Sequence, residues 1–474
     1  MRSQKPFLAV LVTFCVITCA YAQPTTPVAQ SPVSNIPLIE NFKNTDRVLI
    51  LAPHPDDEAI ACAGVIQNAL DSGAQVRVVY LTNGDHNEFA FIVYEKRLVF
   101  RKDAFIHLGN LRKKEAVRAM KVLGLSEDKL LFLGYPDFGT FAVFARYWQR
   151  SRPYMSWLTR ISSVPYKGDL SYGASYTGES VLSDIKRVLM DYKPNKIFVS
   201  HPADTNPDHR ADYLFLEIAL ADTEKFIGRP RVYSYLVHSY GWPVPRHYHP
   251  ELWLMPPEQF QKSAAEWKKF ELSAEQLNKK YMAILCNKTQ TESSAFYLFA
   301  FARRNELFGD FPAVRLIDRK EPNEGKLLMG VRILDDLMRG TSEGETAEDA
   351  LVLRGRGKVR YEIKDGCFVV GITKPREAVS RFSAMVYIFG YSKKIPFERM
   401  PKICMISQRK DLAVFDANNQ IKAEGATLEF GEKEVVFKIP LEILGDPDFV
   451  LVSARAQTTM LHHDASAFRK IILK

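Results

Sequence analysis

Short apolar runs alternate with amphipathic stretches along the first half of the chain. The run Val48–Ala52 predicts a buried strand that ends at Pro53, because proline cannot extend a strand ladder. Small and apolar residues then recur at helical spacing as far as Leu70, and Gly73 ends the helix. A second run, Val76–Leu81, predicts the next strand. A strand, a helix and a strand at this spacing form a βαβ unit with parallel strands.

The same alternation continues to about residue 312. Residues 86–110 are expected to be a polar and aromatic connection. The chain from 41 to 312 is therefore predicted to be an α/β domain with a mostly parallel sheet. Further strands are predicted at Leu130–Leu133, Lys196–Ser200 and Arg231–His238, and further helices at Arg112–Leu123, Val181–Tyr192, Ala211–Leu220 and residues 258–306.

One segment of this domain, residues 138–179, is crowded with Phe, Tyr, Trp and Arg and has no clear period. A loop of this length inside a compact domain is uncommon unless it is functional. Two interpretations stay open: aromatic rings that stack on sugar faces, or an insertion that packs on its own rings.

The segment from residue 313 to 474 has a different texture, with short strand-like runs between turn residues. This pattern predicts a β-sandwich. The segment carries no metal or nucleophile pattern, so a spacer role and a glycan-binding role both stay open. The runs are Leu351–Arg354, Val359–Ile363, Phe368–Ile372, Met385–Phe389, Leu412–Phe415, Glu434–Ile439, Phe449–Ala454 and Lys470–Leu473.

The start of the chain predicts export. Residues 1–22 have a basic start, the apolar run Phe7–Thr18 and small residues at Ala20 and Ala22, which is typical of a cleaved secretory signal. Residues 23–40 are rich in Pro, Ser, Thr and Gln and predict an extended linker. No later stretch is long and apolar enough to cross a bilayer. We therefore expect the mature protein in the periplasm, at the cell surface or secreted, without a transmembrane segment.

Composition narrows the classes of function. The 474 residues, of which 46% are hydrophobic, suffice for two or three domains. The net charge of +9 falls to +7 without Arg2 and Lys5, and no dense basic tract stands out, so we expect no nucleic-acid partner. Six cysteines include two in the signal, and the other four lack CxxC spacing, which argues against a structural zinc knuckle or a disulfide framework.

Polar residues follow several predicted strands at the point where each strand ends. Because the carboxyl ends of parallel strands share one edge of a sheet, these groups can converge there. They are His54 with Asp56 and Asp57, then Asp85, then Asp137, then the cluster at residues 201–209.

His54 and Asp57 are three residues apart and share a face at the start of a helix. They make half of a divalent metal site, and His209 as third ligand gives the His₂Asp pattern of a catalytic zinc with an open position. Asp56 then lies beside the metal, near its water. The alternative stays open that His54 is a hydrogen-bonded structural residue and that the acids favour a helix N-terminus.

The hexapeptide Pro53–Glu58 (PHPDDE), paired with the distal Asn206–Arg210 (NPDHR), resembles the PIG-L/LmbE family of zinc-dependent de-N-acetylases. The resemblance extends over roughly residues 45–310. Other segments that look like this family are Thr82–Asp85, Arg112 with Glu115, Leu123–Gly124, Leu133–Asp137, Tyr235–His238 with Trp242, Gln290 and Glu306.

The resemblance implies a Rossmann-like sheet that holds one Zn²⁺ through His54, Asp57 and His209. It implies that Asp56 is the general base for the water that attacks an acetamide carbonyl. It also implies that Arg112 and Asp137 bind hydroxyl or charged groups of the substrate, a task that suits a guanidinium and a carboxylate.

One residue departs from the family pattern. Many members have histidine where this chain has Asn206, which can donate a hydrogen bond to an oxyanion but cannot supply a proton. His201 and His238 are the candidates for that proton, or for substrate contacts. Asp204 and Asp208 are candidates to orient His209 from behind, and Asp208, its neighbour in sequence, is the favoured one.

We therefore expect an exported zinc-dependent hydrolase that removes the N-acetyl group from an N-acetylated amino sugar or glycan and releases acetate. Two alternatives stay open. One is an amidase that cleaves a larger acyl group or a conjugate from an amino sugar. The other is a non-catalytic glycan-binding protein with a residual metal site. In that alternative, the lack of an acid at Asn206 has ended catalysis and the metal site has remained.

Overall fold

The computed structural model describes most of the chain after residue 34. The predicted signal, residues 23–34 of the predicted linker and the run Leu351–Arg354 lie outside the described residues. The described residues are 35–86, 102–260, 263–316, 342–344, 346–350, 357–374, 382–408, 411–459 and 462–474.

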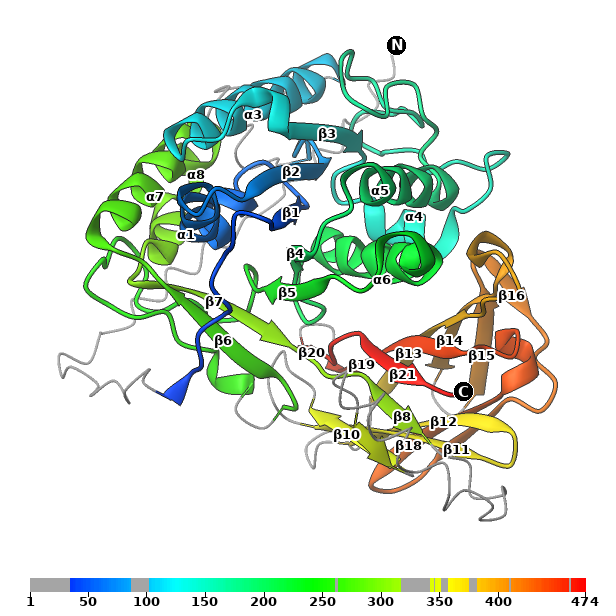
Figure 1. The fold of residues 1–474 in the computed structure, drawn as a ribbon. Coiled ribbons are helices and arrows are strands. Elements are labelled where there is room, and N and C mark those ends of the chain that lie inside the picture. The colour runs from blue at the N-terminus through cyan, green and yellow to red at the C-terminus, as the bar shows by residue number, and fades with distance from the viewer. Residues whose placement is uncertain are drawn as a thin grey trace, which may run out of the picture. The chain divides into compact units, whose positions relative to one another are not determined.

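A mixed seven-stranded sheet organises the first part of the chain, with five parallel strands in the order β3-β2-β1-β4-β5. β7 pairs antiparallel with β5 and with the edge strand β6 (Figure 1). The order reverses at β1, so the carboxyl ends of β1 and β4 flank the crevice where such sheets bind ligands. The strands are β1 (Arg47–Ala52), β2 (Gln75–Thr82), β3 (Leu130–Tyr135), β4 (Lys196–Ser200), β5 (Arg231–Tyr235), β6 (Glu266–Glu271) and β7 (Asn305–Asp310).

Helices cover both faces of this sheet, which explains why β1 is apolar from Val48 to Ala52. Val48 and Ile50 belong to one core with α1, α3 and α7, whereas Leu49 and Leu51 belong to another with α4, α5 and α6 (Figure 1). The predicted α/β fold is confirmed. The helices are α1 (Asp57–Asp71), α3 (Lys102–Val122), α4 (Thr140–Arg146), α5 (Gly178–Tyr192), α6 (Pro207–Ile227), α7 (Ala274–Cys286) and α8 (Lys288–Leu298).

Two predictions of secondary structure were wrong. The connection predicted at 86–110 ends earlier, because α3 begins at Lys102. Phe105 and Leu108 belong to the buried face of this helix, whose exposed residues here are polar. The stretch 258–306 is not helical throughout, because it contains β6 and the start of β7. β6 lies at the sheet edge and consists largely of Glu and Lys, as edge strands commonly do, and these charged residues conceal its period in the sequence.

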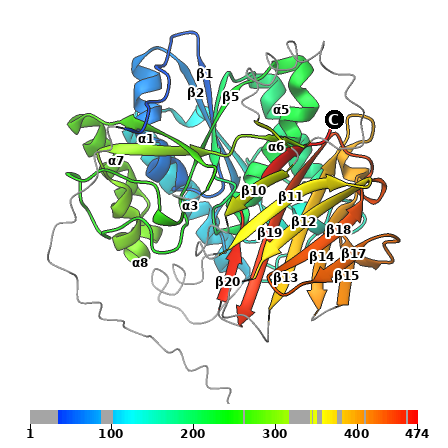
Figure 2. The same ribbon diagram turned by 90° about the horizontal axis from the view of Figure 1, so that it is seen from below.

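Two further sheets confirm the predicted β-sandwich (Figure 2). The smaller has the order β10-β11-β12-β18-β17, and the larger runs from β16 through β15, β14, β13, β19, β21 and β8 to β9, with β20 paired to β19. The apolar residues between them form a separate core. The strands are β8 (Val314–Leu316), β9 (Ser342–Gly344), β10 (Thr346–Ala350), β11 (Lys358–Lys364), β12 (Cys367–Thr373), β13 (Ser383–Tyr391), β14 (Lys402–Gln408), β15 (Asp411–Asp416), β16 (Asn419–Ile421), β17 (Thr427–Phe430), β18 (Glu434–Pro440), β19 (Phe449–Thr459), β20 (His462–Ala465) and β21 (Arg469–Ile472).

The larger sheet of the sandwich packs on α4 and α6, and residues 36–474 form one compact unit. The Phe141 and Phe468 rings lie 5.9 Å apart, and the Phe144 and Phe389 rings lie 5.1 Å apart. The first part of the aromatic segment 138–179 therefore supports the sandwich. The boundary predicted at residue 312 stays a prediction.

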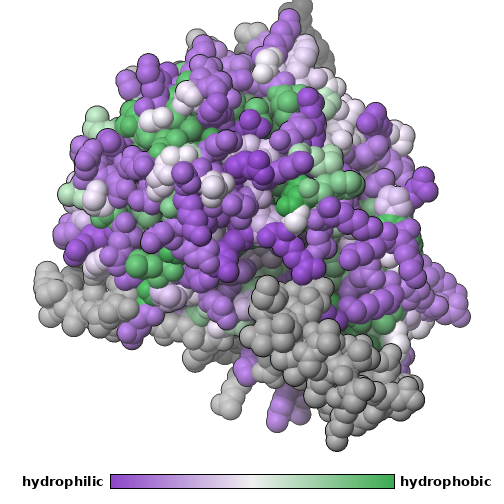
Figure 3. All heavy atoms as spheres, viewed as in Figure 1, coloured by the Kyte–Doolittle hydropathy of each residue, from purple (hydrophilic) through white to green (hydrophobic). Residues whose placement is uncertain are grey.

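The surface drawn in Figure 3 is mostly hydrophilic, with hydrophobic residues in separate patches. Among the helices of the described ranges, none has the length and apolar character needed to cross a membrane.

Candidate active site

The site begins where β1 meets α1. Asp56 has a φ of 136°, a conformation that residues with a side chain rarely adopt, just before the helix begins at Asp57. The Asp56 carbonyl accepts hydrogen bonds from the N–H groups of Ala59 and Ile60 at 3.0 Å, and its own N–H donates to Glu58 at 3.0 Å. These contacts hold the strained backbone, and backbone strain of this kind concentrates at functional sites.

Three side chains meet at the end of β1 and the start of α6. Oδ2 of Asp57 lies 3.3 Å from Nδ1 of His54 and 3.2 Å from Nε2 of His209. Ligand atoms around a tetrahedral zinc at about 2.0–2.1 Å are about 3.3 Å apart, so these two spacings fit a metal. All three side chains are buried, and one ligand atom from each lies within 4.8 Å of the others.

The second nitrogen of each imidazole faces a carboxylate. Nε2 of His54 lies 3.1 Å from Oδ1 of Asp137 and 3.3 Å from Oδ2 of Asp208, and Nδ1 of His209 lies 3.2 Å from Oδ2 of Asp204. Metal-binding histidines commonly have such an outer carboxylate, which fixes the ring. The prediction that Asp208 orients His209 was wrong, because Asp208 contacts His54 and Asp204 contacts His209.

The charges around these imidazoles favour a cation. Burial opposes protonation of His209, but Asp204 and Asp57 raise its pKa to about 10. Burial likewise opposes ionisation of Asp57, but His209 and His54 lower its pKa well below the usual range. Because the buried carboxylates hold positive charge on the imidazoles, a divalent cation would replace protons here.

Asp204 and Asp208 also fix the loops around the site. Asp204 accepts hydrogen bonds from the N–H groups of Asn206, Val237 and His238 at 2.8–3.0 Å. Asp208 accepts from the N–H of Phe138 at 2.5 Å and from the N–H of Thr140 at 3.0 Å. Each carboxylate therefore connects an imidazole to a neighbouring strand end.

Arg112 connects Asp56 to the rest of the site. Its Nη2 lies 3.3 Å from Oδ2 of Asp56 and donates to the Pro55 carbonyl at 2.9 Å, and its Nη1 donates to the Gly84 carbonyl at 2.9 Å. A Cβ at Gly84, whose φ is +67°, would collide with the guanidinium. Burial raises the pKa of Asp56 to about 7, although Arg112 opposes the shift.

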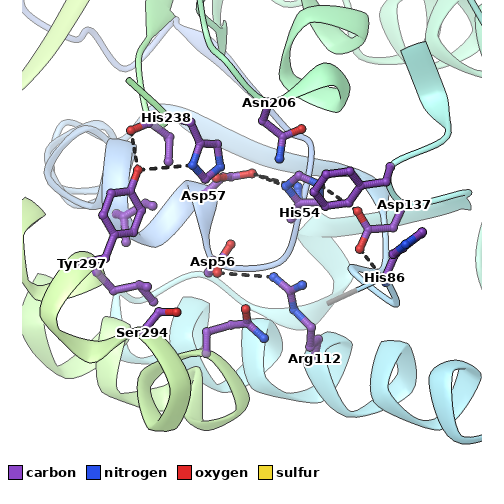
Figure 4. Close-up of a pocket in the computed structure, with 15 residues that line it drawn as sticks. His54, Asp56, Asp57, His86, Arg112, Asp137, Asn206, His238, Ser294 and Tyr297 are labelled. Carbon is purple, nitrogen blue, oxygen red and sulfur yellow. Dashed lines mark hydrogen bonds and ion pairs between the residues drawn. The ribbon is translucent and has the colours of Figure 1, made fainter. Parts of the chain in front are cut away.

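The side chains of His54, Asp56, Asp57 and Arg112 line a cavity of about 400 Å³, which suits a small ligand (Figure 4). Asn206 lies at the N-cap of α6, and its side-chain oxygen accepts from the N–H of Asp208 at 2.8 Å, which leaves its NH₂ group as a donor. The His238 ring is 4.7 Å from the His209 ring, and burial lowers the pKa of His238 to about 4. The predicted site residues on the cavity wall are His54, Asp56, Asp57, Arg112, Asp137, Asn206 and His238.

His201 does not reach this cavity, which corrects its prediction as a substrate contact. Its ring stacks on Trp267 at 5.5 Å and contacts Phe260 and Phe311. Its Nδ1 accepts from the N–H of Ala203 at 3.1 Å, and burial lowers its pKa to about 3. His201 is therefore a neutral core residue.

Sequence reasoning missed one wall of the cavity, which comes from α8. Gln290, Ser294, Tyr297 and Leu298 line it, and Ser294 interrupts the helix with a φ of −138° and a ψ of 29°. The Tyr297 hydroxyl donates to the Val237 carbonyl at 2.6 Å and lies 3.3 Å from Nδ1 of His238 (Figure 4). The resemblance to the family includes Gln290, but no spacing in the sequence ties this residue to a motif of the site.

Comparisons with known proteins show partial similarity to named deacetylases. A 93-residue segment is 37% identical to 1D-myo-inositol 2-acetamido-2-deoxy-alpha-D-glucopyranoside deacetylase of Tsukamurella paurometabola, covering 19% of this chain and 30% of that protein. The protein of Mycobacterium bovis with the same name is 31% identical over 93 residues, which cover 20% of this chain and 29% of that protein. The matched segment thus spans less than a third of these relatives.

Solved structures show more distant similarity. N,N'-diacetylchitobiose deacetylase from Pyrococcus horikoshii is 18% identical with a TM-score of 0.35, covering 56% of this chain and 84% of that chain. The hydratase GalB from Pseudomonas putida is 16% identical with a TM-score of 0.36, covering 56% of this chain and 97% of that chain.

The family model described as "PIG-L: GlcNAc-PI de-N-acetylase" matches residues 49–220. The match includes both predicted motifs, the one that begins α1 and the one that begins α6. Residues 49–220 of this chain therefore form a PIG-L domain.

Proposed function

We propose that this protein is an exported, zinc-dependent hydrolase that removes the N-acetyl group from an N-acetylated amino sugar or glycan and releases acetate. The observation that carries the proposal is that Asp57 lies between His54 and His209, while Asp56, next to Asp57 in sequence, lines the cavity. The names of the relatives support the reaction. Export rests on the signal pattern of residues 1–22.

His54, Asp57 and His209 are the residues that would hold the metal, with Asp137, Asp208 and Asp204 behind the imidazoles. A bound zinc ion supplies a Lewis acid and lowers the pKa of water from about 15.7 to about 7. The carboxylates behind the rings keep the two ligand nitrogens pointed at Asp57.

Asp56 acts as the base. Arg112 pairs with Oδ2 of Asp56, and we assign to Oδ1 the proton of the water that attacks the acetamide carbonyl carbon. The new C–O bond forms as that proton moves to Asp56. The C–N bond then breaks, the proton passes to the leaving amine, and the products are acetate and the free amino sugar.

Asn206 stabilises the charge that develops on the carbonyl oxygen. Its own oxygen is occupied by the N–H of Asp208, so its NH₂ group is the part that donates to the substrate. A donor fixed in this way needs no reorganisation during the reaction, which is the basis of oxyanion stabilisation. Asn206 has no titratable proton, and burial lowers the pKa of His238 to about 4, so that His238 carries no proton to give at pH 7. We therefore assign both proton transfers to Asp56.

The test replaces Asp56 with asparagine and measures acetate release from N-acetylglucosamine oligomers together with zinc content. We expect kcat to fall roughly 10²–10⁴-fold with zinc retained, because only the base is lost. The matched control is Glu58→Gln, since burial raises the pKa of Glu58 to about 8 and glutamine mimics its neutral form. Glu58 is buried beside Asp56 but does not line the cavity.

Each outcome separates the alternatives. Undiminished acetate release by Asp56→Asn would remove Asp56 from the base role. A zinc-loaded wild type that binds acetylated glycans but releases no acetate would favour a binding protein. Release of a longer acyl group in preference to acetate would favour the amidase.

A further inference from the structure

Aromatic rings continue from the cavity onto the surface. Phe138 lines the cavity, yet 52% of it is exposed, and 65% of Trp157 is exposed. The His86 ring, which also lines the cavity, is 5.3 Å from the Phe138 ring and 6.1 Å from the Trp157 ring. Figure 4 shows His86 beside Asp137 at one side of the cavity. Phe138, His86 and Trp157 thus form one aromatic strip that leads out of the site.

The inner part of this strip is fixed to the candidate metal site. Phe138 has a φ of 55°, in the left-handed region, and its N–H donates to Oδ2 of Asp208 at 2.5 Å. The N–H of His86 donates to Oδ2 of Asp137 at 2.7 Å. Both carboxylates also contact Nε2 of His54. A left-handed phenylalanine is rare, and such conformations persist where surrounding contacts enforce them and function uses them.

The chemistry of the strip suits a sugar ring. A pyranose presents a face of C–H groups, and aromatic faces carry partial negative charge that attracts them. The hydroxyl groups at the sugar's rim stay in water, which fits rings that are half exposed rather than enclosed. An apolar acyl chain would need a covered groove to remove its surface from water.

We propose that Phe138, His86 and Trp157 form a stacking subsite for the second sugar ring of a glycan whose N-acetylated ring occupies the cavity. The proposal rests on the proposed function, and it names the substrate class as an oligosaccharide. The strip is continuous with the cavity wall, so a ring linked to the one at the reaction centre reaches it directly.

The experiment compares the N-acetylglucosamine monomer, dimer and tetramer as substrates of the full-length protein. We expect Trp157→Ala to lower kcat/KM roughly tenfold on the dimer and tetramer and to leave the monomer unchanged, because only the longer substrates lose a stacking surface. Trp157→Phe should restore most of the difference. The matched control is Tyr172→Ala, since Tyr172 is 54% exposed in the same segment but lies outside the proposed strip, whereas Trp157 contacts the His86 ring.

A second readout measures binding alone. In the Asp56→Asn background, the tetramer should change the tryptophan fluorescence, and Trp157→Phe should abolish that change. A Trp157-dependent change without acetate release from wild type would keep the subsite and reject the proposed function. Equal loss on monomer and tetramer, or fluorescence that is independent of Trp157, would overturn the subsite.

Discussion

The cavity has two walls of different character. The wall from the PIG-L domain is charged and buried, with His54, Asp56 and Asp57 where β1 meets α1 and Arg112 in the middle of α3. The wall from α8, beyond the matched residues 49–220, is neutral and offers an amide, a serine hydroxyl and a phenol. Charged side chains that catalyse the cleavage of an amide bond must be fixed in place and removed from water. Neutral polar groups can form hydrogen bonds with the hydroxyls of a sugar. Under the proposed function, we therefore assign the chemistry to the first wall and the selection of substrate to the second.

The two walls are nevertheless joined. Glu115 on α3 accepts hydrogen bonds from Thr289 of α8, at 3.1 Å from the N–H and at 2.6 Å from the hydroxyl. The same helix carries Arg112, which pairs with Asp56. A shift of α8 would thus reach the charged wall through α3.

The largest effect should follow from Asp57→Asn, which weakens the charged wall at its centre. The amide oxygen can still accept from the N–H of His54, which donates to Asp57 at 2.9 Å, so the fold should hold. We expect loss of zinc and a fall in acetate release of roughly 10³-fold or more. Metal analysis and a melting curve check this. Full zinc content in the variant would contradict the assigned ligand set.

A smaller effect should follow from Asp204→Asn, which removes the carboxylate behind His209. We expect zinc affinity to fall roughly 10–100-fold, because the ring loses its fixed orientation. A competition titration with a chelator measures this. Asp222→Asn is the control, since Asp222 pairs with Lys186 at 3.0 Å and does not line the cavity. Equal zinc affinity in the two variants would reject the positioning role of Asp204.

The neutral wall should respond differently. Ser294→Ala and Gln290→Ala should each raise KM for the glycan roughly 3–10-fold with kcat within about twofold, because each side chain contributes one uniform substrate contact. Steady-state kinetics with acetate detection separates the two constants. A matching fall in kcat would show that α8 takes part in the chemistry and would remove the distinction between the walls.

His201 lies outside both walls, so its replacement should change stability alone. Because the folded pKa is about 3 and the ordinary value is 6.5, the unfolded state binds the proton more readily between these values. The free energy of unfolding therefore falls as pH drops from 6.5, by about 2 kcal/mol at pH 5.

In His201→Asn, the amide oxygen can still accept from the N–H of Ala203, which donates to Nδ1 of His201 at 3.1 Å. The variant should therefore lack the fall in the free energy of unfolding that His201 causes at low pH. Denaturant unfolding of both proteins at pH 7 and pH 5 measures it. His238 also has a low pKa, but it is common to both proteins and cancels. The core assignment of His201 would be contradicted if both proteins lost the same free energy of unfolding between pH 7 and pH 5. Reduced activity of the variant at pH 7 would also contradict it.

Much of the charged wall could be predicted because its residues lie in short motifs at strand ends, where parallel strands bring them together. The pairing of Asp204 with His209 could not, since sequence adjacency favours Asp208 while the turn of α6 directs that side chain to His54. The wall from α8 was missed for a related reason. Its placement depends on the contact of Thr289 with Glu115, 174 residues earlier, which leaves no periodic signal.

The sandwich contacts the loop before α6 and the first turn of α6, which carries His209, and this has a consequence for folding. The N–H of Phe468 donates to the Pro202 carbonyl at 3.0 Å, and Arg210 donates to the Ser466 carbonyl at 3.4 Å, across 256 residues of chain. Contacts of such long sequence separation form slowly. During synthesis, the start of α6 with the candidate ligand His209 emerges long before the strands that contact it. We therefore expect the candidate metal site to form late, as one of the final events of folding.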